Sequence, residues 1–238
     1  MNPYIIFNGI SSEEIGLEGL IIEKLPDEMK PARNFEEVKI LGRNGSAIDD
    51  LGTYAPYNTS MQINCSGARL TDIYAWLSGE GWLTTSDDPE YMRYIGIYDQ
   101  FKDQRFRAEA CYDSITVPIK VQPFKFKVLQ EQITLTAADV FPGQGNCKAK
   151  PILEITGTGD ITLMVNNSSV LIDDLDGTLI LDCDTETPYS ETNGVKSFQG
   201  RKITVIDNIW PELDTDSNSI SWSGNISRVI IHPWWRWI

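Results

Sequence analysis

A regular alternation of apolar and polar residues between positions 91 and 128 most constrains how this chain can fold. From Ile115 to Val121 every second residue is apolar, and threonine, proline and lysine occupy the positions between them. A period of two is typical of a strand with one face in a core and the other in solvent. The pattern predicts three successive strands near residues 92–97, 106–110 and 115–121, separated first by a polar turn at 99–104. They would form a meander over one half-buried core.

The rest of the first half predicts further strands and one helix. Strands are expected at residues 4–7, 15–22 (bent at Gly16 and Gly19), 57–66 and 81–85, the last forming a hairpin with 92–98 through a turn at 87–89. Apolar residues at helical spacing predict a helix over 70–77, which Ser66 or Thr71 would cap and Gly79 would end.

A polar, charged segment at residues 26–50 interrupts this apolar pattern. It contains a candidate strand at 36–41 followed by Asn44-Gly45, a dipeptide that favours a tight hairpin turn because both central residues need positive φ. We expect a projecting arm or hairpin here rather than a part of the core. Two of its cations, Arg33 and Arg43, lie in a chain dominated by acids, so each is a candidate for an ion pair across a subunit interface.

The second half has the rhythm of an all-β domain. Gln122-Pro123 interrupts the central alternation, which resumes until Val128, and we place a domain boundary there, giving domains 1–130 and 131–238. Many short strands with no amphipathic helix predict a sandwich or jelly roll. The expected strands are residues 133–136, 152–156, 161–165, 170–173, 178–183, 203–206, 219–222 and 226–232, with turns at 157–160, 166–168 and 174–177.

Composition excludes several classes of function. The 238 residues carry 34 acidic and 20 basic side chains, a net charge of −14, so the clustered basic face of a duplex-binding protein is missing. No apolar run approaches the length of a membrane span, and the first residues do not resemble an export signal, so we expect no membrane anchor. Four scattered cysteines without a C-x-x-C pair favour buried thiols in a reducing cytoplasm.

No recognisable catalytic, cofactor or metal site stands out. His232 is the only histidine and lies at the end of a candidate strand, and no nucleotide-binding or nucleophile motif is present. Acidic residues gather at Asp173, Asp174 and Asp176 and again at Asp182 and Asp184. We interpret them as solvated turn carboxylates; a weak calcium site and an acid-pair glycan hydrolase are the less favoured alternatives.

The chain ends in Trp234-Trp235-Arg236-Trp237-Ile238. Three tryptophans on one short strand alternate between its faces, so at least one ring would point outward unless a partner covers it. Closure of the core by this last strand is one interpretation. The other is that Trp234, Trp235 and Trp237 contribute to a partner interface or a sugar-stacking surface, because tryptophan is favoured in such places.

The order and spacing of these features resemble the distal tail protein (Dit) family of long-tailed, non-contractile bacteriophages. The similar stretches are Phe7-Asn8-Gly9, Ile15-Gly16-Leu17, the arm residues Ile40-Leu41-Gly42-Arg43-Asn44-Gly45, the helix at 70–77, the border from Val117 to Lys125, Trp222-Ser223-Gly224 and the tryptophan-rich end. They span nearly the whole chain.

The resemblance implies a mainly β protein of two domains. The first would be a β-sandwich-like, ring-forming domain with one helix and a projecting hairpin, and the second a galectin-like β-sandwich outside the ring. Six copies would close a ring around a DNA channel in the tail tip. The protein would be made in the host bacterial cytoplasm. Its partners would be the major tail protein, a tail-associated hub or fibre protein and a receptor-binding protein.

Within such a ring, Arg33, Arg43, Asn44 and Gly45 of the arm are the expected oligomer-interface residues. The protein would be structural rather than an enzyme and would need no cofactor. A carbohydrate-binding module that uses the acidic, aromatic second half is the alternative from a different class.

Overall fold

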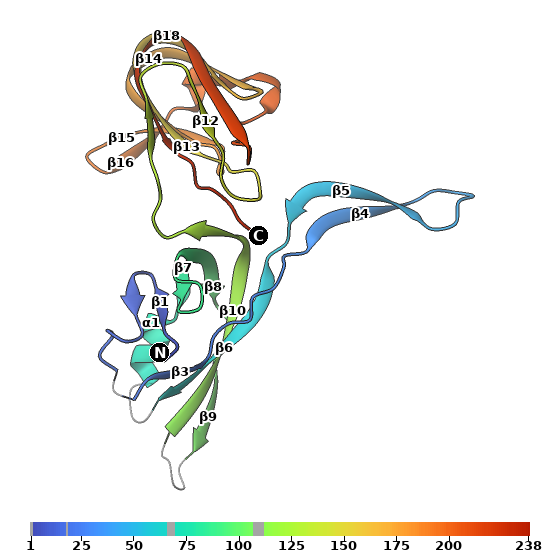
Figure 1. Cartoon of the computed structure of the whole chain (residues 1–238), viewed down its shortest axis with the longest axis vertical. Helices are drawn as coiled ribbons and strands as arrows, with labels where there is room; N and C mark the ends of the chain where they lie inside the picture. Colours follow the sequence, from blue (N-terminus) through green and yellow to red (C-terminus); the bar gives the residue numbers. More distant parts are fainter. Residues whose placement is uncertain (1, 18, 66–69, 107–111) are drawn as a thin grey trace. The chain divides into compact units, whose positions relative to one another are not determined.

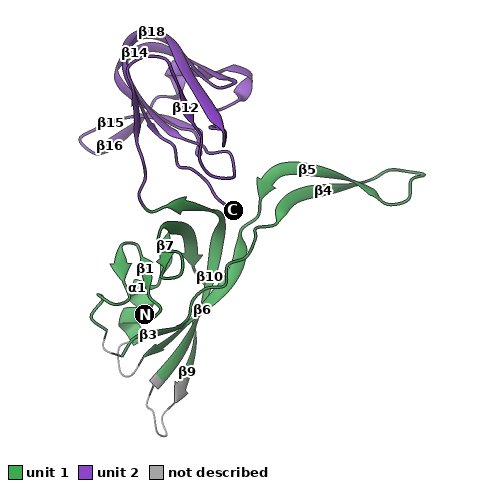
Figure 2. Cartoon of the chain, viewed as in Figure 1, with its two compact units in different colours: residues 1–128, 238 green, residues 129–237 purple. Residues whose placement is uncertain are grey.

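The computed structural model describes residues 2–17, 19–65, 70–106 and 112–238 (Figure 1). Residues 1–128 together with Ile238 form one compact unit, and residues 129–237 form a second (Figure 2). The described chain is mainly β with one α-helix, which confirms the predicted fold class. No helix in these ranges is long and apolar enough to cross a membrane.

Unit 1 is built around an eight-stranded antiparallel sheet in the order β2-β1-β7-β8-β10-β6-β3, with β9 paired to β10. Two further strands, β4 and β5, form a separate two-stranded sheet. The elements are β1 (Ile5–Phe7), β2 (Ile10–Ser11), β3 (Ile21–Lys24), β4 (Arg33–Lys39), β5 (Ser46–Tyr54), β6 (Tyr57–Cys65), α1 (Leu70–Trp76), β7 (Gly79–Thr85), β8 (Tyr91–Ile97), β9 (Lys102–Phe106) and β10 (Tyr112–Lys127).

The core of unit 1 follows the alternation seen in the sequence. In β10 the side chains of Ile115, Val117, Ile119 and Val121 are buried, whereas the residues between them are half-buried or exposed. The helix α1 buries Ile73 and Trp76 against this core, as its helical spacing predicts. Thr71 lies inside the first turn of α1 rather than at its cap, and the other predicted cap, Ser66, lies outside the described residues.

Two predicted strands of unit 1 are placed differently. The strand expected at 15–22 begins only at Ile21; before it, Gly16 and Gly19 both have φ of 72°, outside the extended region. Of the strand expected at 106–110, only Phe106 lies in the described part of the chain, as the last residue of β9; residues 107–111 lie outside it. β9 begins at Lys102 and so takes up the second half of the predicted turn at 99–104. The meander is also wrong in its order, because β8 pairs with β10 and not with β9.

The tight Asn-Gly turn is found at the N-terminus and not in the arm. Asn8 (φ 50°) and Gly9 (φ 79°) both have positive φ and connect β1 to β2 by a two-residue turn. In the arm, Lys39 pairs with Ser46, so the loop has six residues and Asn44-Gly45 is only its end. The predicted two-residue turn at Asn44-Gly45 is therefore wrong, although the hairpin itself is present.

Unit 2 is a second eight-stranded sheet, in the order β11-β18-β13-β14-β15-β16, with β12 paired to β18 and β17 to β14. Its strands are β11 (Ile133–Leu135), β12 (Asp139–Pro142), β13 (Ile152–Val165), β14 (Ser168–Asp182), β15 (Thr187–Thr192), β16 (Val195–Phe198), β17 (Ile203–Val205) and β18 (Ser217–His232). The long strands curl, so that both halves of the sheet enclose one core (Figure 1).

The short strands predicted for this half are halves of longer ones. Residues 157–160 do not form a turn, because β13 runs through them with a register shift between Gly159 and Ile161. In the same way, β14 runs through the predicted turn at 174–177. β18 runs through the gap between the strands predicted at 219–222 and 226–232. Gly157 permits this path, because a Cβ there would lie 2.4 Å from the carbonyl oxygen of Asn225. The glycine-rich stretches are bends within strands, where the sheet curls, rather than loops between them.

Candidate assembly surface

The β4–β5 arm projects from unit 1 as a two-stranded ribbon (Figure 1). Its register pairs Phe35 with Asp50, Glu37 with Ile48, and Val38 with Ala47. Because side chains alternate between the faces of a strand, Phe35 and Ile48 share one face of the ribbon and Val38 and Ala47 share the other.

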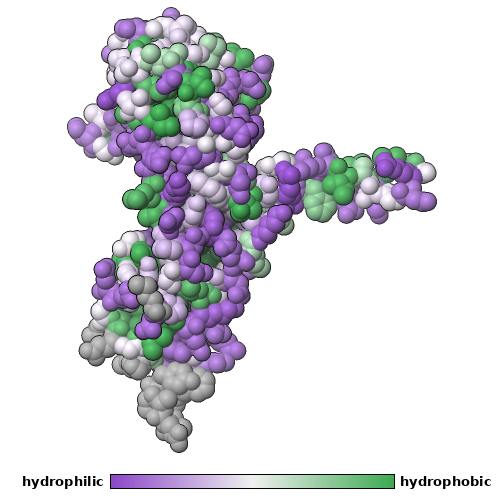
Figure 3. Space-filling view, viewed as in Figure 1, coloured by the Kyte–Doolittle hydropathy of each residue, from purple (hydrophilic) through white to green (hydrophobic). Residues whose placement is uncertain are grey.

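Both faces of the arm leave apolar side chains in solvent. The exposed fractions are 53% for Phe35, 70% for Ile48 and 49% for Val38, and Leu41 in the tip loop is fully exposed. Figure 3 shows these apolar atoms among polar ones along the arm. A two-stranded hairpin in water is marginally stable without a further surface against it. The arm therefore carries exposed apolar side chains that no other described strand covers.

Of the arm residues predicted at an interface, Arg33 lies at the base and the other three lie in the tip loop. The guanidinium of Arg33 is 3.2 Å from the Asp50 carboxylate and lies over the ring of Tyr54, so this cation pairs within its own ribbon. Arg43 donates its backbone N–H to the carbonyl oxygen of Ile40, and its side chain is exposed. Asn44 and Gly45 follow it in the loop and are also exposed.

The tryptophan-rich end does not continue β18 as a strand. β18 ends at His232, and the backbone of Arg236 then forms an isolated bridge with Cys147. Trp235 is buried, with 4% of its surface exposed, and Trp234 and Trp237 are half-buried. The Arg236 guanidinium is 2.7 Å from the Asp184 carboxylate. Trp235 therefore belongs to the core of unit 2, and Trp237 packs against that core.

The acidic cluster at 173–176 lies within β14 and not in a loop between helices. Asp174 has φ of 47° and its N–H is bonded to the Asp160 carboxylate, so this is the bend of the curled strand. The calcium-loop alternative therefore lacks its local structure. In the described ranges, no three His, Cys, Asp or Glu side chains are grouped so that they could hold a metal ion.

Two further residues that could take part in chemistry are His232 and Cys183. The His232 Nε2 is 2.7 Å from Glu154 Oε1, and its Nδ1 is 3.3 Å from the Gln132 amide. Burial raises the pKa of the Cys183 thiol, which keeps it protonated at neutral pH and unreactive as a nucleophile.

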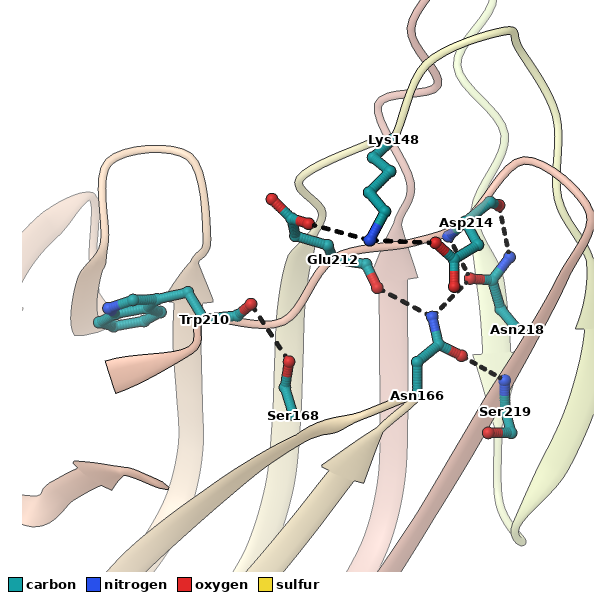
Figure 4. A network of polar contacts seen from close by, with 8 residues as sticks. All are labelled: Lys148, Asn166, Ser168, Trp210, Glu212, Asp214, Asn218 and Ser219. Atoms are coloured by element: carbon teal, nitrogen blue, oxygen red, sulfur yellow. Dashed lines mark hydrogen bonds and ion pairs between the residues drawn. The ribbon is translucent and has the colours of Figure 1, made fainter. Parts of the chain in front are cut away.

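A polar network in unit 2 was not predicted from the sequence (Figure 4). The buried Asn218 accepts a hydrogen bond from the Asp214 N–H at 2.7 Å and donates to its carbonyl oxygen at 3.0 Å. Asn166 donates to Asn218 and accepts from the N–H of Ser219, both at 2.9 Å. The network fixes the segment before β18 against the β13–β14 turn.

Lys148 lies at the outer side of this network, 3.4 Å from Asp214 and 3.5 Å from Glu212 (Figure 4). These carboxylates, Asp214 most strongly, raise the pKa of its ammonium group. The hydrogen bonds of the network join separate segments of unit 2, which favours a structural role. No local sequence pattern could have revealed it, because its members come from four separate segments.

Comparison with known proteins supports the fold on which this surface is built. No protein-family model matches the sequence, and no characterised protein matches it by sequence. Among solved structures, the chain is similar to the Dit protein of phage SPP1 with a TM-score of 0.71 and 11% identity, covering 97% of this chain and 98% of that one. A chain of the phage P2 baseplate, in its activated conformation with calcium, is similar with a TM-score of 0.54 and 6% identity, covering 97% of each. Over nearly its whole length, this chain therefore has the fold of the SPP1 Dit protein.

Proposed function

We propose that this chain is a structural, non-enzymatic component of a phage baseplate: a distal tail protein whose hexameric ring joins the tail tube to the tail tip and its adhesion device. The observation that carries the proposal is the likeness in fold to SPP1 Dit, which extends over both units. The structure of that protein is described as a paradigm of the hub adsorption apparatus in phages that infect Gram-positive bacteria.

The uncovered arm supplies a physical reason for assembly. Its apolar faces need a surface outside their own ribbon, and a second copy of unit 1 would supply it. If each arm binds the next subunit in a head-to-tail manner, the contact is heterologous and closes into a ring when the rotation between copies fits. Residues 1–130 would form this ring, and residues 131–238 would form the galectin-like outer domain.

The other partners follow from this position in the tail. The ring would contact the major tail protein on one side and a tail-associated hub or fibre protein on the other. The outer domain would face a receptor-binding protein with the half-buried Trp234 and Trp237, whereas Trp235 is buried in its core. DNA would pass through the channel without specific binding, because a net charge of −14 repels phosphate. The protein would be made in the host cytoplasm and act at the tip of the virion tail.

The mass of the purified protein in solution tests the ring. We expect a hexamer by light scattering, and a ring in electron micrographs of the same sample. Ile48→Asp places a charge on one apolar face of the arm and should reduce the species to a monomer. Asp173→Asn, far from the arm in sequence and also exposed, is the control and should remain hexameric.

The tip loop is tested separately by charge reversal. Arg43→Glu should shift the hexamer toward monomer, whereas Arg228→Glu, an exposed cation of unit 2, changes the net charge equally and should not. An unchanged mass for both Ile48→Asp and Arg43→Glu at dilute concentration would exclude the arm as the interface. A monomeric wild-type protein that binds cell-wall glycan would support the carbohydrate-binding alternative instead.

A further inference from the structure

The chain enters the arm through residues 25–32, here called the strap, which connect β3 to β4 without forming a helix or strand. A cavity of about 40 Å³ lies at the strap, lined by Pro26 and Glu28 and by Leu83, Ile95 and Val121 of the sheet. This volume has room for about two or three water molecules. Apolar packing beneath this part of the strap is therefore incomplete, and other contacts must hold it on the sheet.

Glu28 makes those contacts. Its carboxylate accepts a hydrogen bond from Arg93 of β8 and lies 3.7 Å from the ammonium group of Lys125 on β10. Only 17% of the Arg93 side chain and 18% of the Lys125 side chain are exposed. One carboxylate of the strap thus bridges two largely buried cations on neighbouring strands.

The same two cations have partners in the body of unit 1. Lys125 is 2.8 Å from the Asp88 carboxylate, in the turn between β7 and β8. Arg93 donates to the hydroxyl of Tyr57 at 3.3 Å. A largely buried cation is costly without a paired anion, so both cations favour a conformation in which Glu28 stays bound. Asp88 and Glu28 neutralise the same cluster, but only Glu28 connects it to the strap.

We propose that Glu28 is a positioning residue for the arm: it fixes the strap on β8 and β10, and thereby sets where β4 leaves the sheet. The returning strand has a fixed point of its own, because the ring of Tyr54 at the end of β5 packs edge-on against Phe124 of β10, with ring centroids 5.8 Å apart. With both ends of the ribbon held, the arm is oriented before it meets a partner, and less ordering remains to be done on binding. The consequence for assembly rests on the proposed ring.

Neutralising Glu28 and Asp88 in turn separates positioning from general stability. Lys30 is followed by Pro31 and resists trypsin, whereas the bond after Lys24, where the strap begins, becomes accessible when the strap lifts. The initial rate of tryptic cleavage at Lys24 therefore reports the lifted population when lifting is fast relative to cleavage. Glu28→Gln should raise that rate roughly two- to fivefold, the size expected for losing an ion pair whose carboxylate is more than half exposed. Asp88→Asn, which removes a charge from the same cluster but leaves the strap attached, should change it less than about twofold.

Thermal unfolding of both variants tests whether Glu28 acts only through the overall stability of the protein. We expect both to unfold at nearly the wild-type temperature. Equal cleavage at Lys24 in wild type and Glu28→Gln would overturn the proposal. Equal acceleration in the two variants, or a loss of thermal stability large enough to explain the acceleration, would overturn it as well.

Assembly is measured on the same proteins. In Glu28→Gln the concentration for half-assembly should rise by the factor by which the positioned fraction of subunits falls, because only subunits with a positioned arm are competent. The cleavage rate, compared with that of an unfolded peptide of the same sequence, gives the lifted fraction from which this factor follows. A wild-type protein that never forms a ring would remove the proposed function, while the cleavage rates would still decide whether Glu28 holds the strap. A ring that assembles equally well in Glu28→Gln, although the cleavage rate shows that most of its straps are lifted, would show that the arm is oriented by its partner and would overturn the positioning role.

Discussion

The β4–β5 arm and the β13–β14 hairpin are both long antiparallel pairs, yet they place their apolar residues in opposite environments. In β13, Leu153, Ile155 and Leu163 are fully buried, because the curled sheet of unit 2 closes over them. In the arm, Ile48 and Phe35 stand in solvent on a ribbon that no other described strand covers. The same secondary structure therefore stabilises the folded chain in one place and is available to a partner in the other.

Truncation of a buried and an exposed apolar side chain gives the largest contrast. Leu163→Ala should lower the free energy of unfolding of unit 2 by about 2–5 kcal/mol, because it removes buried contacts and leaves a cavity. Ile48→Ala should change the unfolding free energy by no more than about 0.5 kcal/mol. Urea denaturation followed by tryptophan fluorescence measures both. Comparable losses would mean that the arm is covered within the single chain, contrary to its exposure.

The second-largest effect is expected for a buried polar side chain of unit 2. Asn218→Ala should lower the unfolding free energy by about 1–3 kcal/mol, because the N–H of Asp214 and the amide of Asn166 lose a buried partner. Ser219→Ala is the control, since Asn166 contacts the backbone N–H of Ser219 and not its side chain. The same denaturation experiment applies, and a stable Asn218→Ala protein would show that water replaces the lost bonds.

The smallest effect is expected for the exposed carboxylates. Asp176→Asn should leave the unfolding free energy within about 0.5 kcal/mol of wild type, and assembly and infectivity nearly intact. The reason is that these acids would act together as an electrostatic field, which extends over about 8 Å, the Debye length at physiological salt. Incubation of the purified protein with peptidoglycan and teichoic acid is the opposing test. Turnover that this substitution abolishes would identify an enzyme.

Several parts of the fold could be predicted because the physics that decides them is local. The alternation from Ile115 to Val121 predicts β10 and its buried face, and helical spacing predicts α1. Local signals also misled: glycines near 157–160 and 174–177 resemble turns in sequence but bend long strands in the structure. A turn and a bulge use similar residues, and only the neighbouring strand decides between them.

The sequence by itself determined the period-two pattern, the single helix and a charged hairpin without a core, because each depends on residues close together in the chain. The tertiary structure decided what those elements pack against. It placed Trp235 in the core of unit 2, left Ile48 in solvent, and brought Glu28, Arg93 and Lys125 together from three distant segments. Burial and ion pairing depend on residues distant in the chain, and no spacing along the sequence encodes such a meeting.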